Sequence, residues 1–176
     1  MHSFLRASLV LISMLLAGAT LGETVDKTAS KHIPKSNVEE LGVLKTVEKQ
    51  EAAAEAKATC AADEHTFCFQ NGRFAVQVGW KDFSGATGVG TVVDQPLSDN
   101  SGVFWFFNAG NWEMLVKVLD GCSLNDRFWV FSAATTDVEY TLTVTDTANG
   151  TTATYTNPLG NAAAALTDTS ALETCP

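Results

Sequence analysis

Residues 138–145 read VEYTLTVT, in which apolar residues stand at the even-numbered positions and glutamate or threonine stands between them. Because successive side chains of a strand point to opposite faces of a sheet, this alternation predicts a half-buried β-strand. The same period of two recurs in RFAVQVGW (73–80) and in WEMLVKV (112–118). These three segments predict strands that share one buried layer.

Further segments extend the predicted sheet structure. GVFWFF (102–107) and FWVF (128–131) are continuous apolar runs, which suit strands covered on both faces, and TTATYT (151–156) is rich in a residue that favours strands. The dipeptide Asn71-Gly72 predicts a hairpin turn back to residues 65–70.

About seven short strands separated by turn sequences predict an all-β fold over residues 60–176, an antiparallel immunoglobulin-like β-sandwich. Trp80 is a candidate for its core tryptophan. Residues 81–101, which contain three glycines, are expected to form a long mobile loop.

The composition excludes several classes of protein. The 176 residues carry 20 acidic and 11 basic side chains, and this net charge of −9 leaves too few cations to neutralise nucleic acid. A hydrophobic fraction of 45% is too high for a wholly disordered chain. The sequence contains no glycine motif typical of nucleotide binding, so we expect no cofactor.

The N-terminus has the pattern of a signal peptide. Arg6 precedes a short apolar run, residues 9–16, and the small residues Ala17-Gly18-Ala19 follow it. We expect residues 1–19 to be removed, with a cut after Gly22 as the alternative. The run is shorter than the roughly 20 residues that a membrane span needs, and no later stretch could form one. We therefore expect a secreted or periplasmic protein.

Residues 20–59 differ in composition from the rest of the chain, because between the signal peptide and Cys60 they contain no aromatic residue. Ser36 and Glu39 form a capping-box pattern, and residues 37–58 are rich in helix-forming residues. The segment is expected to be a helical or flexible spacer. The alternative is a helix that docks on a partner or forms a coiled coil.

Four cysteines in an exported protein indicate two disulfides. A zinc site is the alternative, although the sequence contains no CxxC pair. Three pairings are possible, and we favour Cys60–Cys68 with Cys122–Cys175. The first bond would hold the start of the domain, and the second would tie the C-terminus to a turn in mid-chain.

Four stretches of residues 60–176 resemble a domain that recurs in secreted bacterial proteins. They are NGRFAVQVGW (71–80), GVFWFFNAGNWEMLVKVLDGCSLNDRFWVF (102–131), TTDVEYTLTVTDT (135–147) and TYTNPLG (154–160). The resemblance implies a bacterial origin, export and a β-rich module. It carries no established activity, ligand or catalytic residue to this chain.

The residues give little support to catalysis. His65, the one histidine of residues 60–176, lies between two cysteines expected to form a disulfide, so a nucleophile would lack its usual base. Glycoside hydrolysis needs only two carboxylates that face one cleft. Nine acidic residues are candidates: Asp82, Asp94, Asp99, Glu113, Asp120, Asp126, Asp137, Glu139 and Asp146. Such residues are also typical of the surface of any acidic sandwich, so we expect a non-enzyme, with a carboxylate-pair enzyme as the alternative.

Two binding hypotheses remain. Asp99, Asp120 and Asp126 stand in turn sequences and are weak candidates for calcium ligands of an adhesion module, although aspartates also stabilise turns without metal. Trp105, Phe107 and Trp112 are candidates for binding a carbohydrate or protein partner. In residues 104–107 either the Phe104/Phe106 face or the Trp105/Phe107 face must point away from the core, where it is a binding site if it is uncovered.

Overall fold

The computed structural model describes residues 33–41, 43–49, 59–94 and 98–176. These residues form a β-sandwich of two antiparallel sheets, as the sequence predicts. The strands are β1 (Leu44–Lys49), β2 (Phe67–Phe69), β3 (Phe74–Lys81), β4 (Thr87–Val89), β5 (Thr91–Val92), β6 (Ser101–Trp105), β7 (Met114–Asp120), β8 (Phe128–Ala134), β9 (Glu139–Asp146), β10 (Thr151–Asn157) and β11 (Leu166–Leu172). One short helix, α1 (Cys122–Asn125), follows β7.

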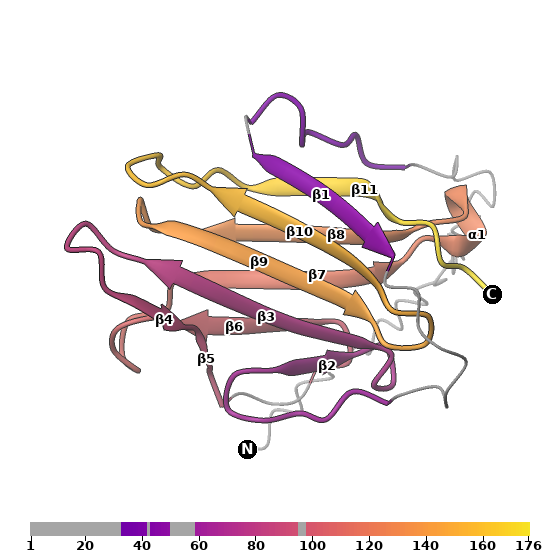
Figure 1. Ribbon diagram of the computed structural model, residues 1–176. Coiled ribbons are helices and arrows are strands. Elements are labelled where there is room, and N and C mark those ends of the chain that lie inside the picture. The colour runs from indigo at the N-terminus through magenta and orange to yellow at the C-terminus, as the bar shows by residue number, and fades with distance from the viewer. Residues whose placement is uncertain (1–32, 42, 50–58, 95–97) are drawn as a thin grey trace, which may run out of the picture. The chain divides into compact units, whose positions relative to one another are not determined.

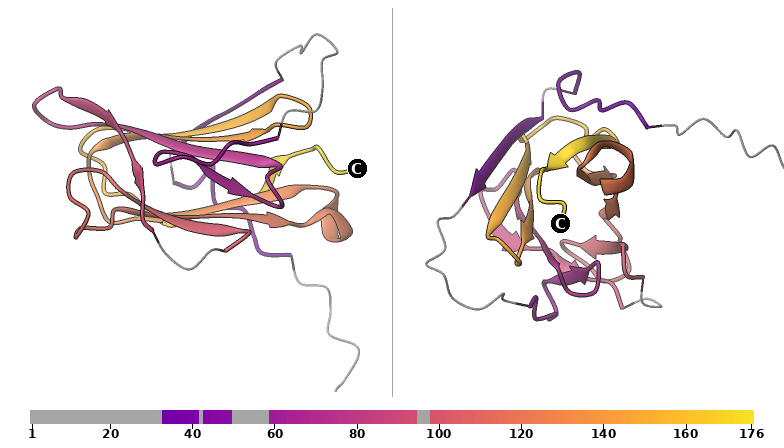
Figure 2. Two further views of the ribbon diagram at one scale, coloured as in Figure 1. Left: turned by 90° about the horizontal axis from the view of Figure 1, so that it is seen from below. Right: turned by 90° about the vertical axis from the view of Figure 1, so that its right-hand side faces the viewer.

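The two sheets lie face to face as separate layers (Figures 1 and 2). The first sheet has the order β1-β10-β9-β3-β2, with β4 paired to β3 outside this path, and the second has the order β11-β8-β7-β6-β5. Neighbouring strands within each sheet are antiparallel, and β9 lies between β3 and β10 over its whole length. β1 and β11 therefore end the two sheets on one side, and β2 and β5 end them on the other.

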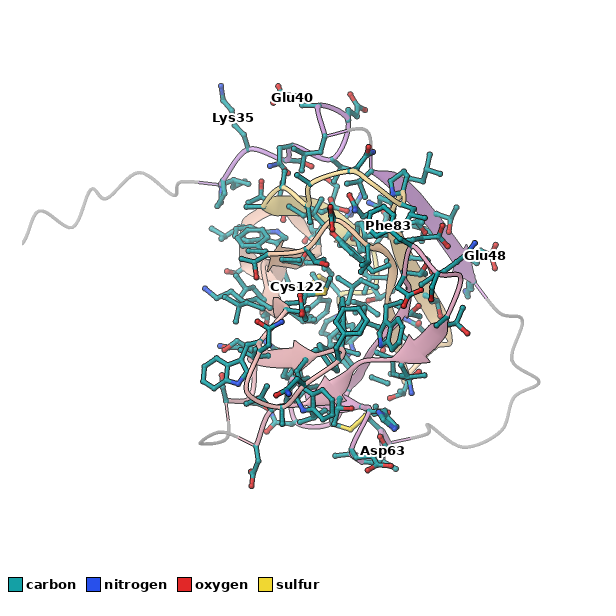
Figure 3. The ribbon with its side chains drawn as sticks, turned by 90° about the vertical axis from the view of Figure 1, so that its left-hand side faces the viewer. Lys35, Glu40, Glu48, Asp63, Phe83 and Cys122 are labelled. Atoms are coloured by element: carbon teal, nitrogen blue, oxygen red, sulfur yellow. A yellow bond between two sulfur atoms is a disulfide. The ribbon has the colours of Figure 1, made fainter. Side chains whose placement is uncertain are left out.

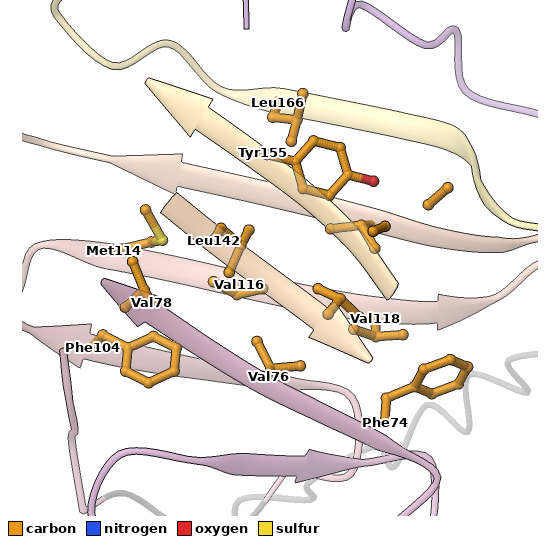
Figure 4. Close-up of a cluster of buried hydrophobic side chains, with 14 of the residues drawn as sticks. Phe74, Val76, Val78, Phe104, Met114, Val116, Val118, Leu142, Tyr155 and Leu166 are labelled. Carbon is orange, nitrogen blue, oxygen red and sulfur yellow. The ribbon is translucent and has the colours of Figure 1, made fainter. Parts of the chain in front are cut away.

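The core fills the space between the sheets with the side chains that the alternation predicts (Figure 4). Phe74, Val76 and Val78 of β3 are fully buried, and Leu142 and Val144 of β9 face the same layer. The second sheet contributes the fully buried side chains Phe104, Val116, Val118 and Val130, together with Met114. Burial of these apolar surfaces is the main favourable term in the folding of such a sandwich.

Both predicted disulfides are present. Cys60 is bonded to Cys68 beside β2, and Cys122 at the start of α1 is bonded to Cys175 near the C-terminus. The Asn71-Gly72 turn is also confirmed, because Gln70, Asn71 and Gly72 have positive φ and connect β2 to β3. Asparagine and glycine adopt this left-handed backbone more readily than other residues.

The prediction of a helical or flexible spacer up to residue 59 is wrong for residues 44–49. They form β1, which pairs along its length with β10, from Leu44 opposite Thr156 to Lys49 opposite Thr151. These residues form a strand despite their helix propensity, because the edge of β10 provides six residues for backbone pairing. The predicted signal peptide and residues 20–32, 42 and 50–58 of the predicted spacer lie outside the described residues.

Residues 33–41 and 43–49 form a strap that contacts both sheets at one side of the sandwich. Asn37 exchanges backbone and side-chain hydrogen bonds of 2.7–3.0 Å with Thr167, and its amide nitrogen donates to the carbonyl oxygen of Ala165. Farther along the chain, the Lys45 ammonium lies 2.6 Å from the carboxylate of Asp168. The strap therefore belongs to the folded domain and closes the side formed by β1, β10 and β11.

The loop expected over residues 81–101 is also partly wrong, because it contains the short strands β4 and β5. β11 is a further strand that the seven predicted segments do not include. Among the described residues, no helix is long and apolar enough to cross a bilayer.

Candidate functional site

Four chain connections gather at one end of the sandwich, at the left of Figure 1. They are the β3–β4 turn (82–86) and the β6–β7 (106–113), β8–β9 (135–138) and β10–β11 (158–165) connections. A backbone hydrogen bond of 2.8 Å from Gly160 to Asp137 joins two of these connections. Loops that a rigid sandwich brings together in this way are a common place for binding sites.

This end exposes large apolar side chains from three of the four connections. Phe83 is 64% exposed, Phe107 48%, Trp112 51% and Leu159 37%. We call these four side chains the aromatic end. Figure 3 views the molecule from this side, with Phe83 near the middle of the face. Since water disfavours apolar surface, several large side chains exposed together indicate a surface that binds a partner.

The turn that carries Phe83 is held in shape by Asp82. Its Oδ1 accepts hydrogen bonds of 2.8 and 2.9 Å from the backbone N–H groups of Ser84 and Ala86. The same oxygen accepts a bond of 2.7 Å from the Ser84 hydroxyl, and these bonds lower the pKa of Asp82. The carboxylate thus stays ionised at neutral pH, and the turn presents Phe83 outward without help from the core.

Phe107 rests on a second ring. Its centroid lies 4.7 Å from that of Trp80 in an edge-to-face arrangement. Trp80 in turn lies over Gly88 of β4, where an ideal Cβ atom would come within 2.3 Å of the indole. Trp80 is therefore half-buried and packs against the end of the core, rather than filling its centre. The Trp80 ring is the surface on which Phe107 packs.

Trp112 follows a tight turn and precedes a buried acid. Gly110 and Asn111 donate backbone hydrogen bonds of 2.8 Å to Asn108, and the Asn111 amide donates to Oε1 of Glu113. Glu113 is 6% exposed, and the loss of hydration raises the pKa of its carboxyl. Glu113 is thus a buried acid that directly follows the exposed Trp112 in the chain.

The three ligand-binding candidates take different positions. Phe104 and Phe106 face the core. Of the two faces of this strand, the one formed by Trp105 and Phe107 therefore points away from the core. Trp105 is half-buried on β6 opposite Thr91. Within the described part of the chain, the ring contacts of Phe107 reach Trp80 and Phe106, and none joins Phe107 to Trp105 or Trp112.

Sequence reasoning missed Phe83 and Leu159. Both are apolar residues within turn sequences, Asp82–Gly85 and Asn157–Gly160, where polar residues are the norm. That contrast is the signal that would have identified them. Their meeting at one end follows from the topology, since an ideal Cβ at Gly160 would lie 4.0 Å from the Phe83 ring.

Two of the three calcium candidates accept hydrogen bonds from backbone N–H groups, and the third ends a helix. Asp99 accepts a hydrogen bond of 2.8 Å from the backbone of Asn71, and Asp120 accepts one of the same length from Cys122. Asp126 ends α1 in the left-handed conformation. The described ranges contain no group of three or more His, Cys, Asp or Glu side chains that could hold a metal ion.

The buried carboxylates have separate partners. Asp146 forms a two-pronged ion pair with Arg73, with nitrogen–oxygen distances of 2.7–3.2 Å. Asp168, which the sequence reasoning did not single out, pairs with Lys45. Asp146 and Glu113 stand at opposite ends of the sandwich, at the end of β9 and the start of β7 (Figure 1). These two acids therefore do not face one cleft.

His65 has a structural role. Its Nδ1 lies 3.0 Å from the carbonyl oxygen of Gly90, and its Nε2 lies 3.4 Å from the carboxylate of Glu64. The ring thus joins the turn before β2 to the chain between β4 and β5.

No family model, curated protein or solved structure matches this chain. The resemblance to a domain of secreted bacterial proteins therefore stays a prediction.

Proposed function

We propose that the chain is an exported, non-catalytic recognition module that binds a carbohydrate or protein partner through the aromatic end. The observation that carries this proposal is the exposure of Phe83, Phe107, Trp112 and Leu159 at one end of a disulfide-bonded sandwich. None of the four is needed to fill the core. Phe83 and Trp112 are the most exposed aromatic side chains among the described residues.

The surroundings favour an uncharged partner surface or a sugar. Aromatic rings stack on the apolar faces of sugars and also anchor protein interfaces. Asp82 and Asp137 lie in the neighbouring turns, and Lys81 is the nearest cation along the chain. An anionic partner would meet repulsion here, since the described domain is strongly acidic.

The proposal is tested with the exported chain on a glycan array and against extracellular proteins of its source. We expect Phe83→Ala combined with Trp112→Ala to abolish the signal, because both substitutions remove exposed rings and leave the core intact. Leu44→Ala removes an equally exposed side chain from β1, at the edge of the first sheet, and is the matched control. Binding that survives the double substitution contradicts the proposal.

The alternative of a carboxylate-pair enzyme rests on Glu113, whose raised pKa is typical of a general acid. A panel of glycosides tests it. Hydrolysis that Glu113→Gln or another single acid replacement abolishes would establish catalysis and overturn the non-catalytic assignment.

A further inference from the structure

The two long sides of the sandwich are closed in different ways. On one side the strap joins β10 and β11 through Asn37 and Lys45. On the other side, β2 ends the first sheet and β5 ends the second. Here backbone hydrogen bonds of 2.8 Å from Val92 to Glu64 and of 2.7 Å from Gln70 to Asp99 connect the two edges.

A pocket of about 340 Å³ opens at this second side. This volume lies at the small end of the range of ligand pockets. Its wall is mainly apolar and includes Phe67, Val92, Val93, Val103 and Leu115. We call it the edge pocket. It lies away from the aromatic end, and none of the four aromatic-end side chains lines it.

The floor of the edge pocket is preformed. The Phe67 ring lies directly over Gly102 of β6, where an ideal Cβ would come within 2.4 Å of the ring. It also packs on Phe69 at 5.3 Å and on Phe104 at 4.9 Å between ring centroids. The Cys60–Cys68 disulfide holds β2 beside it. The residues of the apolar wall are therefore held in position before a ligand binds, which lowers the entropy cost of binding.

The polar groups of the edge pocket are few and carry one sign of charge. The Ser98 and Ser101 hydroxyls lie 2.9 Å apart on its rim, and the Ser98 hydroxyl also donates a hydrogen bond of 3.1 Å to Asn100, which leaves the Ser101 hydroxyl to bond a ligand. Asp63 is its one charged residue, and no lysine, arginine or histidine lines it. A hydrogen bond from the backbone of His65 lowers the pKa of Asp63, so its carboxylate is ionised at neutral pH.

From this lining we infer that the edge pocket binds a small neutral apolar molecule with one hydroxyl end, such as a medium-chain alcohol. The apolar body would contact Val103 and Leu115 on the outward face of β6 and β7, and the hydroxyl would bond to Ser101. The inference is independent of the proposed function, since a different set of residues carries it.

The test uses N-phenyl-1-naphthylamine, a neutral probe whose fluorescence rises in apolar surroundings, with the folded, oxidised chain. We expect saturable binding that 1-octanol displaces. Leu115→Asp places a charge in the wall, and Val103→Trp fills the pocket. Both residues project from the outward face of the second sheet, opposite to Phe104 and Met114, so both variants keep the core.

The matched control is Leu44→Asp, the same exchange at an exposed position on β1. We expect at least tenfold weaker probe binding for Leu115→Asp and Val103→Trp and no change for Leu44→Asp or for Phe83→Ala with Trp112→Ala. Thermal melts check that each variant is folded. Absence of saturable binding, or equal effects of Leu115→Asp and Leu44→Asp, would each overturn the inference.

Discussion

The Nζ atom of Lys45 lies 2.6 Å from Oδ2 of Asp168, and this contact joins the first strand of the sandwich to the last. Asp168 is 1% exposed, and the Tyr155 hydroxyl donates a hydrogen bond of 2.8 Å to the same oxygen. Lys45 also donates to the carbonyl oxygen of Ser170 at 3.0 Å. Among the described residues, Asp168 forms an ion pair with Lys45 alone. The positive charge beside this buried carboxylate therefore comes from the strap.

Removing the ammonium should destabilise the domain more than its position on an edge strand suggests. Lys45→Met leaves Asp168 buried without its countercharge, and we expect a loss of about 2 to 3 kcal/mol of unfolding free energy in urea titrations. Lys49→Met, on the exposed end of the same strand, should change it by less than about 0.5 kcal/mol. Equal losses for the two variants would mean that the ion pair does not stabilise the strap.

Both tyrosines should resist ionisation for as long as the protein is folded. Burial raises the pKa of Tyr140 and, together with the adjacent Asp168 charge, raises that of Tyr155 further. These are the only two tyrosines of the chain. A group with a raised pKa contributes stability at pH values below its unfolded pKa, about 10, and that stability is lost as the pH rises above it.

An alkaline titration followed by phenolate absorption checks this expectation. We expect little absorption just above pH 10 and a steep rise when the protein unfolds, detected by circular dichroism. Tyr155→Phe should weaken the fall of stability above pH 10. A gradual titration centred near the ordinary tyrosine pKa, with the fold intact, would contradict the burial of these hydroxyls.

The two disulfides should contribute unequally. In the chain-entropy model the stabilisation grows with the length of the closed loop, and the sequence separations are 53 for Cys122–Cys175 and 8 for Cys60–Cys68. Replacing the first pair by serine should cost about 4 kcal/mol, and replacing the second should cost about 2.5 kcal/mol. Chemical unfolding of the two double variants compares these losses, and a larger loss for Cys60–Cys68 would contradict the entropic account.

The sequence predicts a strand well where the pattern that defines the strand is local, and poorly where the strand depends on contacts with distant segments. Residues 138–145 alternate strictly, and their burial follows the alternation, because the side-chain period of a strand is local. β11 escapes such reasoning, since its buried positions include Asp168 and Thr169, whose partners come from distant segments. The two-residue strand β5 is too short to produce any pattern.

β1 shows the other limit of sequence reasoning. Leu44 and Val47 lie in the stretch that is rich in helix-forming residues, and in β1 they are 65% and 50% exposed. The strand is held by its backbone pairing with β10 and by Lys45, and neither is visible in local propensity. The aromatic end is likewise not visible in the local sequence. Its residues are recognisable one by one, but only the crossing of the strands brings them together.

Gly102 should be the least replaceable glycine of the edge pocket, because the Phe67 ring occupies the space of its missing side chain. An ideal Cβ there would lie 2.4–2.7 Å from three ring atoms, and the ring is confined by Phe69 and Phe104. Gly102→Ala should therefore cost about 1 to 3 kcal/mol of unfolding free energy. Gly79→Ala is the matched control, since its Cβ would meet nothing closer than 3.9 Å within a strand. Urea unfolding of both variants decides the matter: a stable Gly102→Ala protein would show that Phe67 moves freely and that the floor of the pocket is not fixed.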